Sequence, residues 1–308
     1  MYLIPIVLAM GMLVPVQTAA NARMRGCVSS AWVATLISFC VSALSLLAVC
    51  CVGGVALAPT AAQVQTVPWW GWLGGIIALF TITASIYLFR TLGLLQATVL
   101  PIVGQLVFSL VIDHFGLFRS VQIPLSAMRV LALACLMLGM ALAVVLPKVR
   151  EWRGGVGGDA LCTSLRQILG IVAGGLMASI GAIYGTLGRL LGSPVQASVV
   201  SFIIAAVAML VCCALGGQIG RVRYAFCGRS PWWMWLGGIV GAISVFGNAW
   251  LIPQMGAGVF FMILLIGQML LSVCMEWWGW LGTPKRRISP LQCVGLLLML
   301  VSIALIRL

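Results

Sequence analysis

Charge is what this sequence has least of. Charged residues make up 7% of its 308 positions, and only four residues are acidic. A soluble domain carries about 25% charged residues. With 63% hydrophobic residues and a mean hydropathy of +1.21, the chain has too few polar side chains to cover a surface that faces water. These proportions exclude a soluble globular domain and indicate a protein embedded in a membrane.

The residues that catalysis and metal binding need are also scarce. There is one histidine, and the eleven cysteines include no C-x-x-C pair. Most of these cysteines lie in apolar stretches, where the thiol packs like a small hydrophobic group. No His, Cys and carboxylate cluster has metal-site spacing, and the glycine-rich residues 154–159 lack the flanking strand and helix of a phosphate loop. We therefore predict no enzyme activity, no metal and no cofactor.

Long apolar runs are what the sequence has in abundance. A helix needs about 20 apolar residues to cross the hydrocarbon core of a bilayer. Ten such runs occur, at roughly 3–22, 31–52, 69–89, 93–112, 126–146, 165–186, 195–215, 232–252, 255–276 and 290–306. The predicted fold class is therefore an all-α polytopic membrane protein of about ten transmembrane helices.

A single polar segment divides these runs. Residues 147–164 read PKVREWRGGVGGDALCTS, a mixture of glycine and charge that is typical of a linker. We predict a first five-helix repeat at 1–146, a linker at 147–164 and a second repeat at 165–308. Ala20-Asn21-Ala22 resembles a signal-peptide cleavage site, but the positively charged start of a signal peptide is absent.

The two halves repeat each other at a fixed offset of 163 residues. PWWGWLGGI at 68–76 returns as PWWMWLGGI at 231–239. The same offset places Gly104-Gln105 on Gly267-Gln268 and Asp113 on Glu276. It also places Gly11 on Gly174 and Gly116 on Gly279, before the register slips by three residues and Pro124 matches Pro290. A gapless offset across the central spans indicates an internal duplication.

Each repeat has an odd number of predicted spans, which fixes their relation in the membrane. If the first repeat enters from one side, the second must enter from the other, so the halves are inverted-topology repeats like those of many secondary transporters. Of the 17 Lys and Arg residues, all but Arg119, Arg129, Arg189 and Arg307 fall on the linker side. The positive-inside rule therefore puts the linker in the cytoplasm and both termini outside. These basic residues are dispersed over short loops, so no nucleic-acid partner is predicted.

The motifs resemble a known transporter family. The first helix reads G-x-x-x-P-x-Q-x-x-x-N from Gly11 through Pro15 and Gln17 to Asn21, and PWWxWLGG opens the third helix in both halves. In the fourth helix, Gly-Gln is followed by an acidic residue and a glycine. This pattern resembles the YdcZ-type family of the drug/metabolite transporter (DMT) superfamily, in a fused two-repeat form. The resemblance implies membrane transport and names no substrate.

The halves differ in the polar residues of the first helix. At the 163-residue offset Gln17 falls on Ile180 and Asn21 on Tyr184, so a site built from the two first helices must be chemically asymmetric. Gln17 and Asn21 share a helix face, and Pro15 should kink the helix beside them. They are candidates for substrate binding and gating. The alternative for Asn21 is that it ends the helix at the cytoplasmic surface.

The remaining candidates come from buried polar residues, which are costly in a membrane. Gln105 lies eight residues, or about 12 Å, before Asp113, which places it near the bilayer midplane if Asp113 is at the interface. Gln268 takes the equivalent depth, and Tyr87, Tyr184 and Asn248 are further lining candidates. The alternative is that these side chains only pack or bridge helices.

The acidic pair and the histidine are candidates for gating or coupling. Asp113 and Glu276 are repeat-equivalent, so inversion places them at opposite faces of the membrane. His114 lies beside Asp113, and histidine is the residue type that proteins most often use as a proton carrier. Each could couple transport to protons or another ion, and the alternative is a helix-end residue in the headgroup layer. The tryptophans of the repeated motif are predicted to be interfacial anchors.

Three functions are compatible with these residues. The first is a secondary transporter of the bacterial inner membrane that exports a small organic metabolite or drug-like compound by alternating access, with a homodimer allowed. The second is a translocator of a lipid or lipid-linked substrate, which needs a lateral opening between helices. The third is a non-transporting membrane scaffold, whose centre would be filled by apolar side chains.

Overall fold

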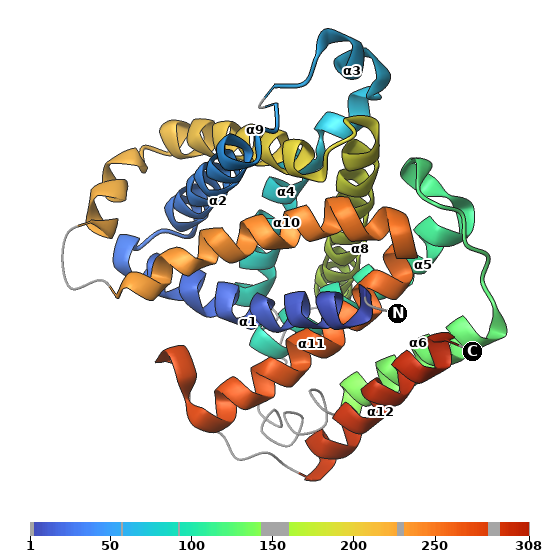
Figure 1. The fold of residues 1–308 in the computed structure, drawn as a ribbon. Coiled ribbons are helices and arrows are strands. Elements are labelled where there is room, and N and C mark those ends of the chain that lie inside the picture. Colours follow the sequence, from blue (N-terminus) through green and yellow to red (C-terminus); the bar gives the residue numbers. More distant parts are fainter. Residues whose placement is uncertain are drawn as a thin grey trace.

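The protein is an all-helical bundle in which every predicted apolar run contains a helix. The computed structural model describes residues 3–56, 58–91, 93–142, 160–226, 231–282 and 290–307, and within these ranges there is no β-strand (Figure 1). The long helices of the first half are α1 (Leu3–Val28), α2 (Ala31–Gly53), α4 (Gly74–Thr91), α5 (Gly93–Phe115) and α6 (Ala127–Met140). Those of the second half are α8 (Ala160–Leu190), α9 (Pro194–Leu215), α10 (Leu236–Met255), α11 (Ala257–Trp278) and α12 (Pro290–Arg307).

Short helical turns connect these long helices. They are α3 (Ala61–Thr66) and the 3-10 helices η1 (Trp69–Trp72), η2 (Leu117–Arg119), η4 (Ile219–Ala225), η5 (Trp232–Trp235) and η6 (Trp280–Gly282). Two long helices extend beyond the predicted runs. α1 continues to Val28, and α8 already begins at Ala160, so the last five residues of the predicted linker are helical.

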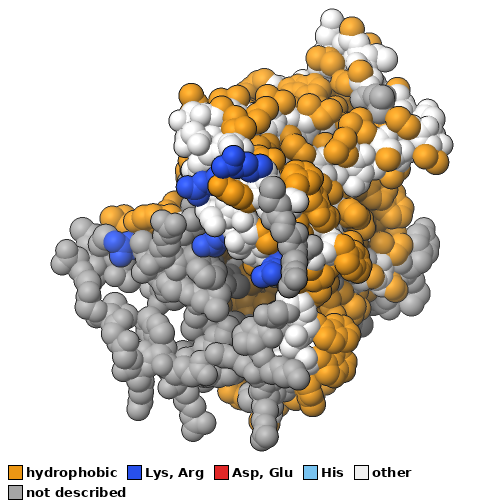
Figure 2. All heavy atoms as spheres, turned by 90° about the vertical axis from the view of Figure 1, so that its left-hand side faces the viewer, with side chains coloured by type: hydrophobic (Ala, Val, Ile, Leu, Met, Phe, Trp, Pro, Cys, Tyr) orange, Lys and Arg blue, Asp and Glu red, His pale blue; other side chains and the backbone are white. Residues whose placement is uncertain are grey.

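The surface and the helix lengths are those of a multi-pass membrane protein. Within the described ranges, six helices are long and apolar enough to cross a bilayer, namely α1, α2, α8, α9, α10 and α11. The whole of α6 and parts of α5 and α12 form shorter apolar helices. Hydrophobic side chains cover most of the described surface in Figure 2, and Lys and Arg side chains gather in a small group on that face. A surface of this kind is stable only in lipid.

Equivalent residues begin and end helices in both halves. Ser30 caps α2 and Ser193 caps α9, each accepting the backbone N–H three residues later at 3.3 Å. Gly116 and Gly279 follow α5 and α11 with left-handed φ values of 61° and 70°, a conformation that favours glycine. The glycine after the acidic residue in the fourth-helix motif therefore serves as a helix stop.

The two halves interlock through glycine crossings. Where α1 crosses α11, a Cβ atom on Gly11 would overlap the carbonyl oxygen of Leu264 and lie 3.1 Å from the Cα atom of Gly267. Where α8 crosses α5, Cβ atoms on Gly174 and Gly104 would overlap the carbonyl oxygens of Pro101 and Ile171. The first helix of each half thus packs backbone to backbone on the fourth helix of the other half, which only glycine permits.

The fifth helices of the two halves pair with each other. Figure 1 shows α6 and α12 side by side, and a Cβ atom on Gly139 would lie 2.7 Å from the carbonyl oxygen of Gly295. Leu136 of α6 and Met299 of α12 join the largest buried cluster, which also contains Phe260 and Ile266 of α11. The pair is therefore attached to the core through α11.

The repeated tryptophan motif forms a 3-10 turn in each half, η1 and η5. Its first tryptophan, Trp69 or Trp232, has 75% of its surface exposed in both copies. Trp70 instead packs edge-on against Phe118 with ring centroids 5.6 Å apart. An exposed indole at the start of a helix is the arrangement expected of an interfacial anchor.

Candidate functional site

A cluster of polar side chains lies where α1, α2 and α10 meet. Ser38 of α2 donates a hydrogen bond from Oγ to Oδ1 of Asn21 on α1 at 2.7 Å. The hydroxyl of Ser42 lies 2.6 Å from the carbonyl oxygen of Gly238 on α10 and 2.8 Å from that of Ser38. Gly237 leaves room for Asn21, whose Oδ1 atom occupies the place of a Cβ. The suggestion that Asn21 ends the first helix is wrong, because α1 continues to Val28.

Gln17 lies one turn before Asn21 on the same face of α1. A Cβ atom on Gly241 would lie 3.1 Å from the Nε2 atom of Gln17 and 3.0 Å from the Oγ atom of Ser42. Gln17 is partly buried and forms no hydrogen bond among the described residues. The helix continues through the buried Pro15. Gln17 therefore presents an unpaired amide to the junction of the three helices.

The equivalent junction of the other half lacks the two amides, although Ser201 stands at the place of Ser38. Tyr184 takes the place of Asn21 and packs its ring on Gly74, with its Cδ1 atom 3.1 Å from the position of a Cβ. Ile180 takes the place of Gln17, and both residues belong to one buried hydrophobic cluster. The chemical asymmetry predicted from the sequence is thus present in three dimensions. Tyr184 packs inside the protein.

Gln105 and Gln268 sit beside the two glycine crossings. The backbone nitrogen of Gln105 lies 2.8 Å from the position of a Cβ on Gly174, and Gln268 follows Gly267 directly. Both side chains are partly buried, and neither forms a hydrogen bond within the part of the chain that the structure describes. An amide in an apolar region needs a hydrogen-bonding partner, so each is available to a ligand or to water.

The other predicted lining residues differ in exposure. Tyr87 on α4 has 46% of its surface exposed. Asn248 on α10 is partly buried and has no hydrogen bond among the described residues.

Asp113 binds the start of another helix. Its Oδ1 and Oδ2 atoms accept hydrogen bonds from the backbone nitrogens of Ala257 and Gly258, both at 2.8 Å. These N–H groups open α11, where they have no intrahelical acceptor. The carboxylate is fully buried, so it is not exposed in a headgroup layer. Gly256, with φ of 84°, lets the chain turn from α10 into α11 directly beside it.

His114 and Glu276 have different surroundings. The Nδ1 atom of His114 accepts the backbone N–H of Leu125 at 3.3 Å, and its ring lies edge-on to Phe115 with centroids 4.7 Å apart. His114 thereby holds the segment after η2 against the end of α5. Glu276, at the end of α11, is partly buried and has no hydrogen bond among the described residues.

Sequence reasoning missed the serines of the polar cluster. Ser38 and Ser42 resemble any other small residue of a transmembrane helix, and only the approach of Gly237 and Gly238 shows that they face a neighbour.

A cavity of about 370 Å³ adjoins the end of α1 and is lined by Ala22, Arg25, Gly26 and Ser29. Across the described ranges, no three His, Cys, Asp or Glu side chains lie close enough to share a metal ion.

Together these features define a multi-pass membrane protein built from two interlocking halves, an architecture that membrane transporters use. The sequence model of one family, described as "Putative inner membrane exporter, YdcZ", matches residues 2–142 and, a second time, residues 165–305. The chain therefore belongs to this family, in a form that contains two repeats, and the resemblance noted from the motifs is confirmed.

Comparison with solved structures supports the fold alone. A protein known from a crystal structure matches with a TM-score of 0.64 and 13% sequence identity, over 97% of this chain and 94% of that one. No protein of curated function matches the chain. The family assignment and the helical architecture together point to a membrane transporter of the inner membrane rather than an enzyme.

Proposed function

We propose that this protein is a secondary transporter that exports a small organic metabolite or drug-like compound by alternating access. The observation that carries this proposal is the set of three partly buried amides, Gln17, Gln105 and Gln268, without hydrogen bonds among the described residues. The side-chain atoms of these amides are not among the fully buried unbonded atoms of the described residues, so each amide can be reached by a ligand. In an apolar membrane bundle such groups are stabilised when a hydrogen-bonding partner binds them, which supports a binding role over a scaffold.

The interlocked halves support the alternating mechanism. If residues 1–146 and 165–308 are inverted repeats, then exchanging their conformations converts an inward-open form into an outward-open form. The glycine crossings are suited to this exchange, since helices that touch through backbone can slide without side chains that interdigitate.

The chemistry of the polar groups indicates the substrate class. The three glutamines and the polar cluster of α1, α2 and α10 offer amides and hydroxyls, and the buried carboxylate of Asp113 is already bonded to α11. Such groups recognise a neutral or weakly polar molecule through hydrogen bonds and offer no full charge to a strongly ionic one.

A ligand screen tests this proposal. Purified protein is heated in the presence of neutral organic compounds, and a compound that binds the folded state raises the unfolding temperature. We expect Gln17→Ala, Gln105→Ala and Gln268→Ala each to weaken binding of the best compound by about tenfold, the effect of losing roughly 1.4 kcal/mol. Gln254→Ala is the matched control, because this exposed amide only bonds Trp250 of its own helix.

Transport of the same compound is then measured with protein in liposomes. Movement across the membrane that all three substitutions leave unchanged would contradict the assignment of the amides. A compound that binds but never crosses would favour a non-transporting role.

A further inference from the structure

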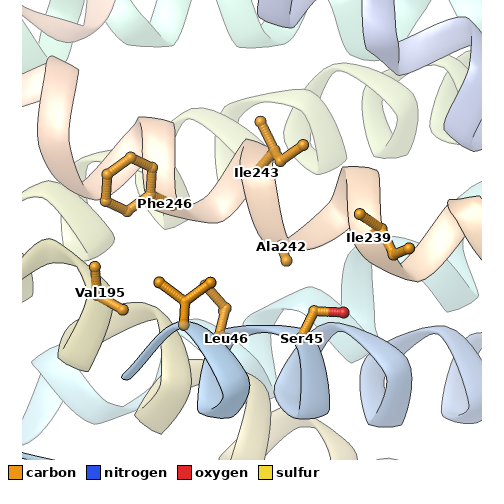
Figure 3. Close-up of a pocket in the computed structure, with 8 residues that line it drawn as sticks. Ser45, Leu46, Val195, Ile239, Ala242, Ile243 and Phe246 are labelled. Atoms are coloured by element: carbon orange, nitrogen blue, oxygen red, sulfur yellow. The ribbon is translucent and has the colours of Figure 1, made fainter. Parts of the chain in front are cut away.

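A groove on the outside of the bundle is separate from the polar cluster. It has a volume of about 290 Å³ and lies between α2, α9 and α10. Figure 3 shows Leu46 and Ser45 of α2 facing Ala242 and Ile239 of α10, with Val195 of α9 at one end. The remaining lining residues are Val49, Ile243 and Phe246.

The lining of this groove is apolar and opens to the surface. Its one polar side chain, Ser45, donates its hydrogen bond to the carbonyl oxygen of Val41 in its own helix at 2.8 Å. Val49, Ile239 and Ile243 have 53%, 41% and 39% of their surfaces exposed. All three helices are long and apolar enough to cross the membrane, so these exposed side chains face lipid. Hence the groove admits an apolar group from the bilayer and offers no recognition of a polar one.

The other half of the chain fills the equivalent place with its own side chains. At the 163-residue offset Val195 corresponds to Trp32, Ala242 to Leu79 and Leu46 to Met209. Met209 is buried there, and both Trp32 and Leu79 pack against its cluster. The groove therefore exists because a tryptophan and a leucine are replaced by a valine and an alanine. Leu46 and Ala242 remain buried in one hydrophobic cluster against which Val195 packs, so the smaller side chains leave room only on the outer, exposed side of the groove. Apolar side chains there gain dispersion contacts when an apolar group fills that room.

We propose that this groove binds one acyl chain of a bilayer phospholipid. The chain is the apolar group that surrounds these helices, and about 290 Å³ approaches the lower end of the roughly 300–1,000 Å³ of small-molecule sites. The groove and the polar cluster lie on different faces of α10. Ala242 faces the groove, whereas its neighbour Gly241 faces Gln17 and Ser42.

The proposal is tested by photolabelling in lipid nanodiscs. A phospholipid with a light-activated diazirine in its acyl chain is reconstituted with the full-length protein, and labelled peptides are mapped by mass spectrometry. Label should concentrate on the α2 and α10 segments that line the groove. The double substitution Val195→Trp and Ala242→Leu copies the residues of the first half and should reduce that labelling about tenfold. Because it fills an empty space, it should also leave the unfolding temperature unchanged or raised.

Val207→Trp is the matched control, because Val207 lies on α9 with 56% of its surface exposed and does not line the groove. This control should label like the unaltered protein. If the double variant does not insert, Ala242→Leu alone gives the same comparison. Labelling spread evenly over the apolar surface, or unchanged when the groove is filled, would overturn the proposal. A second combination of results would also overturn it: no label in the groove of the unaltered protein, and a dimer that dissociates when the groove is filled. The groove would then be occupied by a second copy of the protein.

Discussion

The carboxylate of Asp113 caps the start of α11, a helix to which it does not belong. An N-cap Ser, Thr, Asp or Asn normally accepts the first free N–H groups of a helix. At the start of α11 the N-cap is Gly256, which has no side chain, and Asp113 of α5 supplies both acceptor oxygens. The acidic residue of the family motif therefore joins two helices of different halves.

This role predicts the result of one substitution. Asp113→Asn keeps the size of the side chain but turns an N–H donor toward the N–H of Ala257 or Gly258. One buried donor then lacks an acceptor, which should cost about 1–3 kcal/mol and lower the unfolding temperature in detergent. Glu276→Gln is the control at the equivalent position, since Glu276 has no hydrogen bond among the described residues. Equal losses in the two variants would argue against a capping role.

At the scale of helices, glycine decides which elements can touch. Gly11, Gly104, Gly174 and Gly267 let two helix pairs approach until backbone meets backbone. Gly11→Ala should place a methyl group on the carbonyl oxygen of Leu264, force α1 away from α11 and cost roughly 1–3 kcal/mol or more.

Gly26→Ala in the same helix provides the comparison. No atom lies within 4 Å of a Cβ at Gly26, so this change should be neutral or should stabilise the protein by up to about 1 kcal/mol through helix propensity. Both variants are followed by thermal unfolding and by the folded fraction in gel filtration. The assignment of the crossing would be wrong if Gly11→Ala were tolerated as well as Gly26→Ala.

Much of this architecture can be predicted from the sequence. Hydropathy locates the helices because each must be apolar over about 20 residues, and the 163-residue offset identifies the glycines that recur. The asymmetry of the first helices also follows from the alignment of Gln17 with Ile180 and of Asn21 with Tyr184.

What the sequence could not supply are the contacts between distant residues. Asp113 and the N–H groups it binds are 144 and 145 positions apart, and nothing local at Asp113 points to α11. Ser38 and Ser42 form contacts between helices only because Gly237 and Gly238 let α10 approach α1 and α2. The groove between α2, α9 and α10 depends on three separate segments, so no single segment indicates it.

For the whole molecule, the proposed inversion of the halves makes a prediction about orientation. We expect the segment 147–164 in the cytoplasm and both termini outside, because the Lys and Arg residues are concentrated in the loops on the linker side. An enzyme reporter that is active only outside the membrane should work when fused after Leu308 and fail when inserted at Gly157. Activity in the opposite pattern would reverse the orientation, and activity at both sites would rule out an odd number of spans in the second half.

The interlocking of the halves also has a consequence for how the protein is made. Gly11 of α1 leaves the ribosome 256 residues before Gly267 of α11, the residue against which it packs. At about 5–20 residues per second, that interval is on the order of 10–50 seconds. During this time α1 sits in the bilayer with its glycine face against lipid or another membrane protein. The native bundle therefore closes only when the second half has been inserted, and a chain that stops after its first five helices leaves that face without its native partner.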